Sequence, residues 1–207
     1  MIAIIDYGAG NLFNVAKALQ YLGAEAKVTA KEKEILAAER VILPGVGAFG
    51  DCMHSLEARG LVPVLRRVIA MGKPFLGICV GLQLLFEGSE ESPDVPGLGI
   101  FKGQVKRIHA PALKIPHMGW NSLQITKGTR TLFAHIPAEP YVYFVHSYAA
   151  VPADPSLIAA RTCYGQWLTA AVMQDNVAAM QFHPEKSGAV GLTLLRNFLR
   201  YEEVFPC

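Results

Sequence analysis

Short apolar runs alternate with amphipathic, helix-forming segments through the first half of the chain. The apolar runs are residues 2–5, 26–29, 41–43 and 75–78. One helix is predicted to open at Asn11, a residue type that caps helices, and a charged helix at Lys31. After Asn11, apolar side chains recur at helical spacing at Leu12, Val15, Ala16, Leu19 and Leu22. This alternation predicts an α/β fold with a largely parallel central sheet and flanking helices.

The second half of the chain is richer in β-forming residues. Strands are predicted at residues 105–108, 141–145, 157–162, 167–173 and 177–182. A last helix is predicted from about Gly188 to Tyr201, with a buried face made of Leu194, Leu195, Phe198 and Leu199. Residues 88–99 are rich in Gly, Pro, Ser and Glu and indicate a loop between the halves, not a domain linker. With no internal repeat, we expect residues 1–207 to form a single domain.

Composition and charge exclude several classes of protein. Hydrophobic residues make up 52% of the 207-residue chain and charged residues 17%, a balance typical of compact folds. The net charge is only +2 and Lys and Arg form no stripe, so we expect no nucleic-acid partner. No apolar stretch approaches the roughly 18 residues that a membrane span requires, so we expect no membrane insertion.

The first residues and the cysteines bear on the compartment. The opening sequence MIAIIDYGAG has no basic region and soon reaches Asp6, unlike a secretory signal. The four cysteines lie far apart without CxxC spacing, which predicts neither a disulfide framework nor a metal site. We therefore expect a cytoplasmic protein.

Residues 75–88, FLGICVGLQLLFEG, carry the strongest chemical signal. An apolar strand runs into Gly77-Ile78-Cys79-Val80-Gly81 and then into a helical pattern, which is a nucleophile elbow with cysteine in place of serine. The glycines leave room for a tight strand-to-helix turn, and the start of the helix favours a thiolate. Cys79 is therefore predicted to be exposed and reactive, whereas Cys52, Cys163 and Cys207 are interpreted as small buried apolar residues.

A cysteine nucleophile needs a base, and the best candidate is in Gln181-Phe182-His183-Pro184-Glu185, at the end of the last predicted strand. His183 would move protons and Glu185 would orient its ring. The rigid proline between them favours placing both side chains on one side of a turn. The other histidines are interpreted as structural: His54, His109, His117, His135 and His146.

A second glycine cluster, residues 44–50 with the sequence PGVGAFG, follows the strand at 41–43. Its backbone N–H groups, with that of Val80, could stabilise the oxyanion of an acyl-transfer reaction. The same letters match the dinucleotide fingerprint GxGxxG, an alternative that lacks the acidic residue expected about 20 positions later. No Walker A motif occurs either, so we expect no cofactor.

Substrate recognition is predicted on the helix after the elbow. Positions 79, 83 and 87 recur every four residues and would share one face, which would point Gln83 toward the sulfur. An acid from the group Glu87, Glu90 and Glu91 would suit the ammonium of a free amino acid. The alternative for these acids is a solvated charge run.

Together, GICVGLQ, PGVGAFG and QFHPE resemble the class I (triad) glutamine amidotransferases, whose cysteine, histidine and glutamate hydrolyse glutamine through a thioester. Residues 6–12 (DYGAGNL), 115–121 (IPHMGWN) and 146–148 (HSY) are similar to the family of glutaminase subunits of imidazole glycerol phosphate synthases, from histidine biosynthesis. The resemblance spans nearly the whole chain. It departs at Phe13-Asn14, where many relatives carry a small or basic pair.

The resemblance implies a three-layer fold and a heterodimer with a (β/α)8-barrel cyclase subunit, to which ammonia from L-glutamine would pass. It implies these roles: the triad Cys79, His183 and Glu185; the oxyanion hole Gly47 and Val80; glutamine binding by Gln83, Glu91, Ser147 and Tyr148; and contact with the cyclase by Asn11, Trp120, Tyr143 and Lys186. Because the family couples glutaminase turnover to the cyclase site, we expect Val46 and Gly47 to move, since glycine lets that peptide reorient.

Three alternatives keep parts of this interpretation. The same triad could serve another acceptor, as in the amidotransferases of pyridoxal phosphate, anthranilate or GMP synthesis, although IPHMGWN argues against it. A γ-glutamyl peptidase on the same scaffold would act without a partner. A catalytically silent binding module would have no chemical need for an intact Cys79, His183 and Glu185.

Overall fold

A central eight-stranded sheet organises the chain, whose computed structural model describes residues 1–126 and 132–200. The strand order is β2-β1-β3-β4-β13-β12-β11-β8. In that order the strands are β2 (Ala26–Thr29), β1 (Ile2–Ile5), β3 (Arg40–Gly45), β4 (Phe75–Cys79), β13 (Val177–Met180), β12 (Trp167–Gln174), β11 (Ile158–Cys163) and β8 (Gln124–Ile125). The five strands from β2 to β13 are parallel, and the remaining three join antiparallel. The largely parallel sheet predicted from the apolar runs is therefore confirmed.

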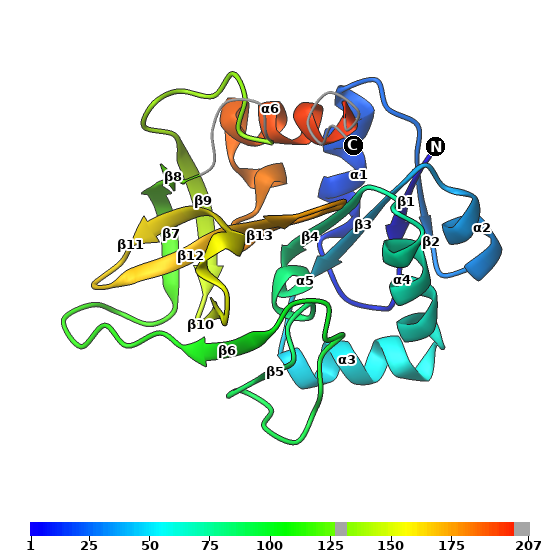
Figure 1. Cartoon of the computed structure of the whole chain (residues 1–207). Helices are drawn as coiled ribbons and strands as arrows, with labels where there is room; N and C mark the ends of the chain where they lie inside the picture. The colour runs from blue at the N-terminus through cyan, green and yellow to red at the C-terminus, as the bar shows by residue number, and fades with distance from the viewer. Residues whose placement is uncertain (127–131, 201–207) are drawn as a thin grey trace.

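Helices cover both faces of the sheet (Figure 1). Helices α1 (Leu12–Tyr21) and α6 (Gly188–Leu199) lie together on one face, and α3 (Phe49–Ala58) and α4 (Leu61–Ala70) lie on the other, with α2 (Glu32–Ala37) beside α4. Strands β1, β3, β4 and β13 are almost entirely buried between these layers, as expected for parallel strands covered on both faces. No helix in the described ranges is long and apolar enough to cross a membrane.

The C-terminal helix agrees with its apolar pattern, with small differences. Leu194, Leu195 and Phe198 are buried, whereas Leu199 is only half-buried. The helix ends at Leu199, and its predicted end at Tyr201 lies outside the described residues. The organisation of residues 1–207 as one domain stays a prediction.

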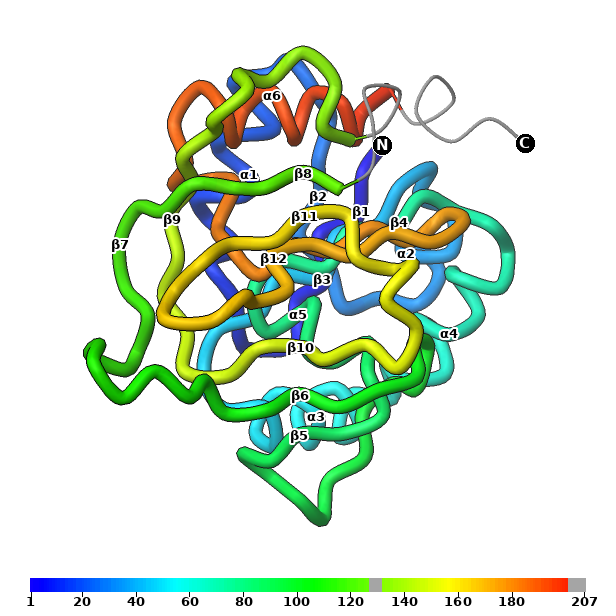
Figure 2. The backbone as a smooth tube through the Cα atoms, turned by 60° about the vertical axis from the view of Figure 1, so that its left-hand side comes forward, coloured from blue at the N-terminus to red at the C-terminus, as the bar shows by residue number. Residues whose placement is uncertain are grey.

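Two small β units lie beside the central sheet, and two of their five strands, near residues 105–108 and 141–145, were predicted from the sequence. A three-stranded sheet has the order β10-β6-β5, with β10 (Tyr148–Pro152), β6 (Gly103–Arg107) and β5 (Gly88–Ser89). A two-stranded ribbon pairs β7 (His117–Ser122) with β9 (Tyr141–His146), and Figure 2 shows it at the side of the molecule. Strand β5 also interrupts the stretch 88–99 that was predicted to be a loop. Strands β5, β7 and β10 were not predicted: β5 has only two residues and β7 carries polar and glycine residues, so no apolar alternation marks those two.

Strand order places the candidate chemistry at one sheet edge. Strand β4 lies between β3 and β13, and all three run parallel, so their carboxyl ends meet. Cys79 ends β4 directly beside Gly45, which ends β3. Strand β13 ends at Met180, two residues earlier than predicted, and the chain then turns through Gln181 toward His183. Such an edge is where open α/β sheets bind ligands.

Close backbone packing behind the cysteine requires glycine. A Cβ on Gly81 would collide with the carbonyl oxygen of Leu43 in β3, and a Cβ on Gly77 would lie 2.8 Å from the carbonyl oxygen of Gly81. Because both neighbours are backbone atoms, neither can rotate away. The elbow can therefore rest against β3 only without side chains at these positions.

We expect Gly81→Ala to lower the free energy of unfolding by about 2–3 kcal/mol, because the methyl group overpacks a backbone contact. Gly50→Ala is the control, since a Cβ there meets chiefly the hydroxyl of Ser92, at 2.7 Å, which can rotate. We expect it to change stability by less than about 1 kcal/mol. Urea denaturation of both variants measures the difference, and equal values would contradict the packing argument.

Candidate active site

Cys79 occupies a strained turn at the end of β4. Its φ of 58° lies in the left-handed region, which is rare for a residue with a side chain and is typical of functional sites. Two details of the prediction are wrong. The side chain is not exposed, because only 3% of Cys79 is accessible. The following helix, α5 (Val80–Gln83), is a single turn and not a long helix, because the chain turns back at Leu84.

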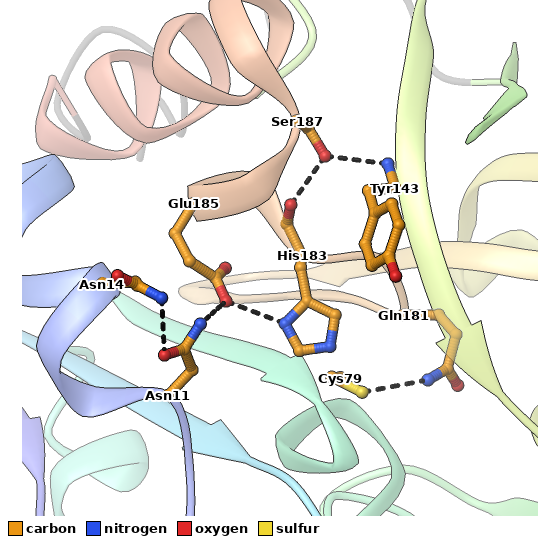
Figure 3. A network of polar contacts seen from close by, with 8 residues as sticks. All are labelled: Asn11, Asn14, Cys79, Tyr143, Gln181, His183, Glu185 and Ser187. Atoms are coloured by element: carbon orange, nitrogen blue, oxygen red, sulfur yellow. Dashed lines mark hydrogen bonds and ion pairs between the residues drawn. The ribbon is translucent and has the colours of Figure 1, made fainter. Parts of the chain in front are cut away.

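His183 and Glu185 lie beside this cysteine, as Figure 3 shows. The Nδ1 atom of His183 is 2.8 Å from Oε1 of Glu185, and both side chains are buried. Because a carboxylate only accepts, Nδ1 carries the proton. The opposite ring nitrogen, Nε2, faces Cys79 and forms no hydrogen bond to any described residue. The ring is thus oriented by the acid and presents a free nitrogen to the sulfur.

Backbone and hydroxyl groups hold the turn that carries His183. Its N–H donates to the carbonyl of Tyr143 in β9 at 3.0 Å. The hydroxyl of Ser187 donates to the His183 carbonyl at 2.6 Å and accepts from the Tyr143 N–H at 3.0 Å (Figure 3). The short helix η2 (Pro184–Lys186) begins directly after His183. The base is therefore fixed to a strand far from it in sequence.

Asn11 supports the same acid from α1. Its amide donates to Oε1 of Glu185 at 3.0 Å, and Asn14 donates to the Asn11 carbonyl oxygen at 2.9 Å. The prediction that Asn11 caps the helix is wrong for its side chain, which forms no capping bond. The Asn11 side chain instead bonds the Glu185 carboxylate. Asn14 belongs to the pair Phe13-Asn14, at which the sequence departs from the family pattern, and it thus helps to position Asn11.

The electrostatic surroundings favour a protonated His183. Burial by itself lowers the pKa of this imidazole, but the Cys79 sulfur and the Glu185 carboxylate on its two sides together raise it to about 9. Glu185 stabilises the imidazolium, and the sulfur adds to this effect. His183 is therefore suited to hold a proton and to deliver it to a leaving group.

A cavity of about 310 Å³ opens in front of Cys79. Seven other residues named from the sequence line it: Val46, Gly47, Val80, Gln83, Glu91, Ser147, Tyr148, with His183 at its side. Pro116, Val145 and His146 complete the wall. The structure therefore brings the predicted nucleophile, the predicted base and all the predicted substrate-binding residues to one cavity, although they come from four separate parts of the chain.

Only one of the three candidate acids belongs to this cavity. Glu91 lines it and accepts a hydrogen bond from the Phe49 N–H at 2.8 Å. Glu87 instead accepts from the Gly103 N–H, and Glu90 from the Arg107 N–H. The predicted face of positions 79, 83 and 87 does not exist, because α5 ends at Gln83. Glu87 and Glu90 tie down the β5–β6 segment.

The glycine cluster 44–50 lies beside the elbow. Gly47 has a φ of 106°, which suits glycine, and its N–H forms no hydrogen bond within the described part of the chain. The arrangement disfavours the dinucleotide alternative. The first N–H groups of α3, where a pyrophosphate would bind, already donate to Glu91 and to Ser92.

Sequence reasoning gave no role to several residues at the site. Gln181 is fully buried and donates to the Cys79 sulfur at 3.8 Å (Figure 3). His146 lines the cavity and is bonded to His117, although both were interpreted as purely structural. The position of Gln181, two residues before His183, was the only feature of the sequence that could have indicated its place at the site. Among the other cysteines, Cys52 is buried as expected, Cys163 is exposed, contrary to prediction, and Cys207 lies outside the described residues.

Outside the cavity, three of the four residues predicted to meet a partner lie together. Trp120 of β7 is 56% exposed and contacts Tyr143 of β9 with ring centroids 6.3 Å apart. The Lys186 ammonium lies 5.8 Å from the centre of the Tyr143 ring. This surface is on the outer side of the ribbon and close to the His183 turn. No group of His, Cys, Asp and Glu side chains suited to a metal occurs among residues 1–126 and 132–200.

Comparison with known proteins agrees with this geometry. The family model described as "Glutamine amidotransferase class-I" matches residues 3–201. Imidazole glycerol phosphate synthase subunit HisH of Thermosynechococcus vestitus is 57% identical over 200 residues, covering 96% of this chain and 95% of that protein. The protein of the same name from Acaryochloris marina is 50% identical over 201 residues, covering 96% and 94%.

Solved structures share the fold. A glutamine amidotransferase crystal structure has a TM-score of 0.77 at 22% identity and covers 99% of this chain and 100% of that one. The structure of PurLQS from Thermotoga maritima has a TM-score of 0.76 at 21% identity, with 97% of each chain covered. These similarities confirm the three-layer α/β fold class.

We expect stability to fall as pH rises through 9, because of His183. Its pKa is about 9 in the folded chain and about 6.5 when unfolded, so the folded state binds the proton more tightly. The contribution of the protonated His183 to the free energy of unfolding is complete below about pH 6.5 and is lost as pH rises through about 9. Its total is on the order of 3 kcal/mol. Urea denaturation from pH 6 to 10 measures it. In His183→Gln the fall in the free energy of unfolding between about pH 6.5 and 9 should vanish. The same pH dependence in both proteins would contradict this expectation.

Proposed function

The chain belongs to the class-I glutamine amidotransferase family, and from this premise we propose that Cys79, His183 and Glu185 are its catalytic triad. The chain is an enzyme of glutaminase type, with the function of the glutaminase subunit of imidazole glycerol phosphate synthase, the name its relatives carry. The observation that carries the triad is the His183 ring, held between Glu185 and Cys79 at the wall of a substrate-sized cavity.

In the proposed reaction, the Cys79 sulfur attacks the side-chain amide carbon of glutamine. His183 takes the thiol proton at Nε2 and passes it to the leaving nitrogen, so that the C–N bond breaks and ammonia leaves. A thioester between Cys79 and the glutamyl group remains. Water then attacks this thioester with His183 as the base, and glutamate leaves while the thiol is restored. The unpartnered Nε2 beside the sulfur supports this assignment.

Each tetrahedral intermediate carries an oxyanion, which we assign to the N–H groups of Gly47 and Val80. Both residues line the cavity at the sulfur, and the Gly47 N–H has no other partner within the described ranges. Val46 and Gly47 stay our candidates for a moving segment. Val46 is largely exposed, and a Cβ on Gly47 would meet no atom within 4 Å, so the peptide has room to rotate.

Glutamine itself would bind between two walls of the cavity. We propose that the Glu91 carboxylate pairs with the substrate ammonium, since Glu91 is the one acid on the cavity wall. The strand start at Ser147 and Tyr148 supplies backbone groups on the opposite side, and Gln83 closes the floor beside Cys79. This arrangement orients the side-chain amide toward the sulfur.

We propose that the partner is a (β/α)8-barrel cyclase that docks on the ribbon surface, defined as the exposed Met118, Trp120 and Lys186 with the half-buried Tyr143. Met118 and Trp120 are 61% and 56% exposed, and contiguous apolar exposure of this kind is typical of interfaces. Asn11, also predicted to contact the partner, donates to Glu185, which directly precedes Lys186. A sealed contact here would also protect ammonia, because in water near neutral pH it is mostly protonated and no longer nucleophilic.

Two alternatives are weaker. Another acceptor, as in pyridoxal phosphate or anthranilate synthesis, does not fit the relatives, which are named imidazole glycerol phosphate synthase subunits. A catalytically silent binding module gives no chemical reason for a His183 ring that Glu185 orients toward Cys79. The cytoplasm is the compartment we propose, since the three cysteines among the described residues are all free, as is usual in a reducing compartment.

Mixing the chain with a candidate cyclase tests the reaction. We expect glutamine to replace ammonium salts as nitrogen source, and Cys79→Ser to reduce the glutamine-dependent rate by about 10³-fold or more while the ammonium-dependent rate is kept. Cys163→Ser is the matched control, because Cys163 is exposed and remote from the cavity. Glutamine-dependent synthesis by Cys79→Ser at the wild-type rate would refute the triad. Equal glutaminase rates with and without the liganded cyclase would refute a moving oxyanion segment.

Trp120→Ala tests the ribbon surface. Loss of an exposed indole at an interface centre is expected to weaken cyclase binding by about 10-fold or more, since aromatic anchors dominate such contacts. Met71→Ala is the control, because Met71 is similarly exposed, at 53%, but follows α4, which lies on the other side of the molecule from the ribbon (Figure 1). Isothermal titration calorimetry compares the two, and an unchanged dissociation constant for Trp120→Ala would place the partner elsewhere.

A further inference from the structure

The backbone carbonyl of Tyr148 is the acceptor of two side chains from different parts of the fold. Nδ1 of His146 lies 2.8 Å from this oxygen, and Nε2 of Gln83 lies 3.1 Å from it. A carbonyl oxygen has no proton, so both nitrogens must be donors. This fixes the tautomer of His146 and the orientation of the Gln83 amide, and each then fixes its own neighbour.

The first arm runs from His146 into the ribbon. With its proton on Nδ1, a neutral His146 accepts at Nε2, where Nδ1 of His117 lies 3.0 Å away and must donate. The Nε2 of His117 is then an acceptor, and the amide of Asn121 lies 3.4 Å from it. Asn121 is also anchored, because it donates to the Cys163 carbonyl at 2.9 Å. This arm ends on β7, on the inner side of the strand that exposes Trp120.

The second arm runs from Gln83 to the nucleophile. The same Gln83 nitrogen donates to Oε1 of Gln181 at 3.0 Å, which leaves the Gln181 nitrogen free to point elsewhere. That nitrogen donates to the Cys79 sulfur at 3.8 Å. Both glutamines are buried. The sulfur thus receives a donor whose orientation is set by the Tyr148 carbonyl.

We propose that His117 and His146 are positioning residues of the glutaminase reaction, which act through the Tyr148 carbonyl, Gln83 and Gln181 to orient the Cys79 sulfur. The chain of bonds needs each histidine to be neutral, with one donor and one acceptor. Burial lowers the pKa of both to about 4, so this state holds at neutral pH. His117 is further immobilised between the rings of Tyr164 and Phe144, with centroids 4.0 and 4.7 Å away.

The placement of the first arm gives the pair a further consequence, which rests on the proposed function. His117 and Asn121 project from the inner side of β7, and Met118 and Trp120 from its outer side. A partner that docks on the ribbon surface therefore contacts β7, the strand from which this series of hydrogen bonds begins. The bonds join this strand to the sulfur without passing through the Val46-Gly47 segment.

Two variants of His146 separate positioning from packing. In His146→Asn the amide nitrogen takes the place of Nδ1 and keeps the bond to Tyr148, but the His117 donor loses its acceptor. In His146→Gln the amide lies near the place of Nε2, so it can accept from His117 but does not reach Tyr148. Because a buried donor without an acceptor is costly, His146→Asn should be the less stable and yet the more active variant.

The readouts are kcat and KM for glutamine with the cyclase present, the rate of Cys79 alkylation by iodoacetamide in the free chain, and urea denaturation. We expect His146→Gln to lose about 10-fold or more in kcat/KM and about 3-fold in alkylation rate, and His146→Asn to stay within about 3-fold in both. His117→Leu packs between the same rings but cannot donate, so the His146 imidazole loses the bond that holds its Nε2 and can turn away from Tyr148, and activity should fall as in His146→Gln. The shorter amide of His146→Asn is held by Tyr148 alone and does not depend on that bond. His54→Asn and His54→Gln, on exposed His54, are the controls for the substitutions themselves.

A structural role alone predicts that activity follows stability, so a variant order that is the same in both measurements would overturn the proposal. So would unchanged alkylation in folded His146→Gln and His117→Leu. If either variant fails to fold, the other decides. Alkylation does not depend on glutamine, so a wild-type chain without glutaminase activity would refute the proposed function while leaving this test intact.

Discussion

The backbone contact between the elbow and strand β3 is the constraint on which the site depends. With no Cβ on Gly81, the turn after β4 rests on the Leu43 carbonyl, and Cys79 is forced to a φ of 58°. The strain is maintained by a fully buried parallel sheet around it. The sulfur therefore faces a cavity while the residue itself is almost completely buried, and reactivity comes from orientation and neighbours, not from exposure.

The groups that act on the sulfur arrive from the second half of the chain. Strand β13 pairs with β4, and this brings Gln181 and His183 to the elbow from about 100 positions away. The His183 turn is fastened to β9 through Ser187, and Glu185 is fastened to α1 through Asn11. The antiparallel part of the structure thus orients His183, the proposed base, whereas the parallel part carries Cys79, the proposed nucleophile.

The ribbon of β7 and β9 lies between the cavity and the outer surface. The ribbon β7–β9 has two sides, one with the exposed Met118 and Trp120 and one with His117 packed on Phe144. The strand after it, β10, begins at Tyr148, which lines the cavity. The surface proposed to meet the partner and the inner side that carries His117 are therefore separated by the thickness of a single strand, and this would be a physical basis for the communication we propose between partner and site.

The sequence by itself determined the parallel sheet, the glycine elbow with Cys79 and the pairing of His183 with Glu185. These follow from local rules: apolar runs form buried strands, glycines mark close packing, and two residues across a proline stay together. Only the tertiary structure decided that α5 is one turn, that Glu91 and neither Glu87 nor Glu90 lines the cavity, and that Asn11 bonds Glu185 instead of capping α1. It also joined Gln181, His146 and His117 to the site. Such contacts link residues distant in sequence, and their side chains choose partners by three-dimensional distance, which periodicity and spacing do not encode.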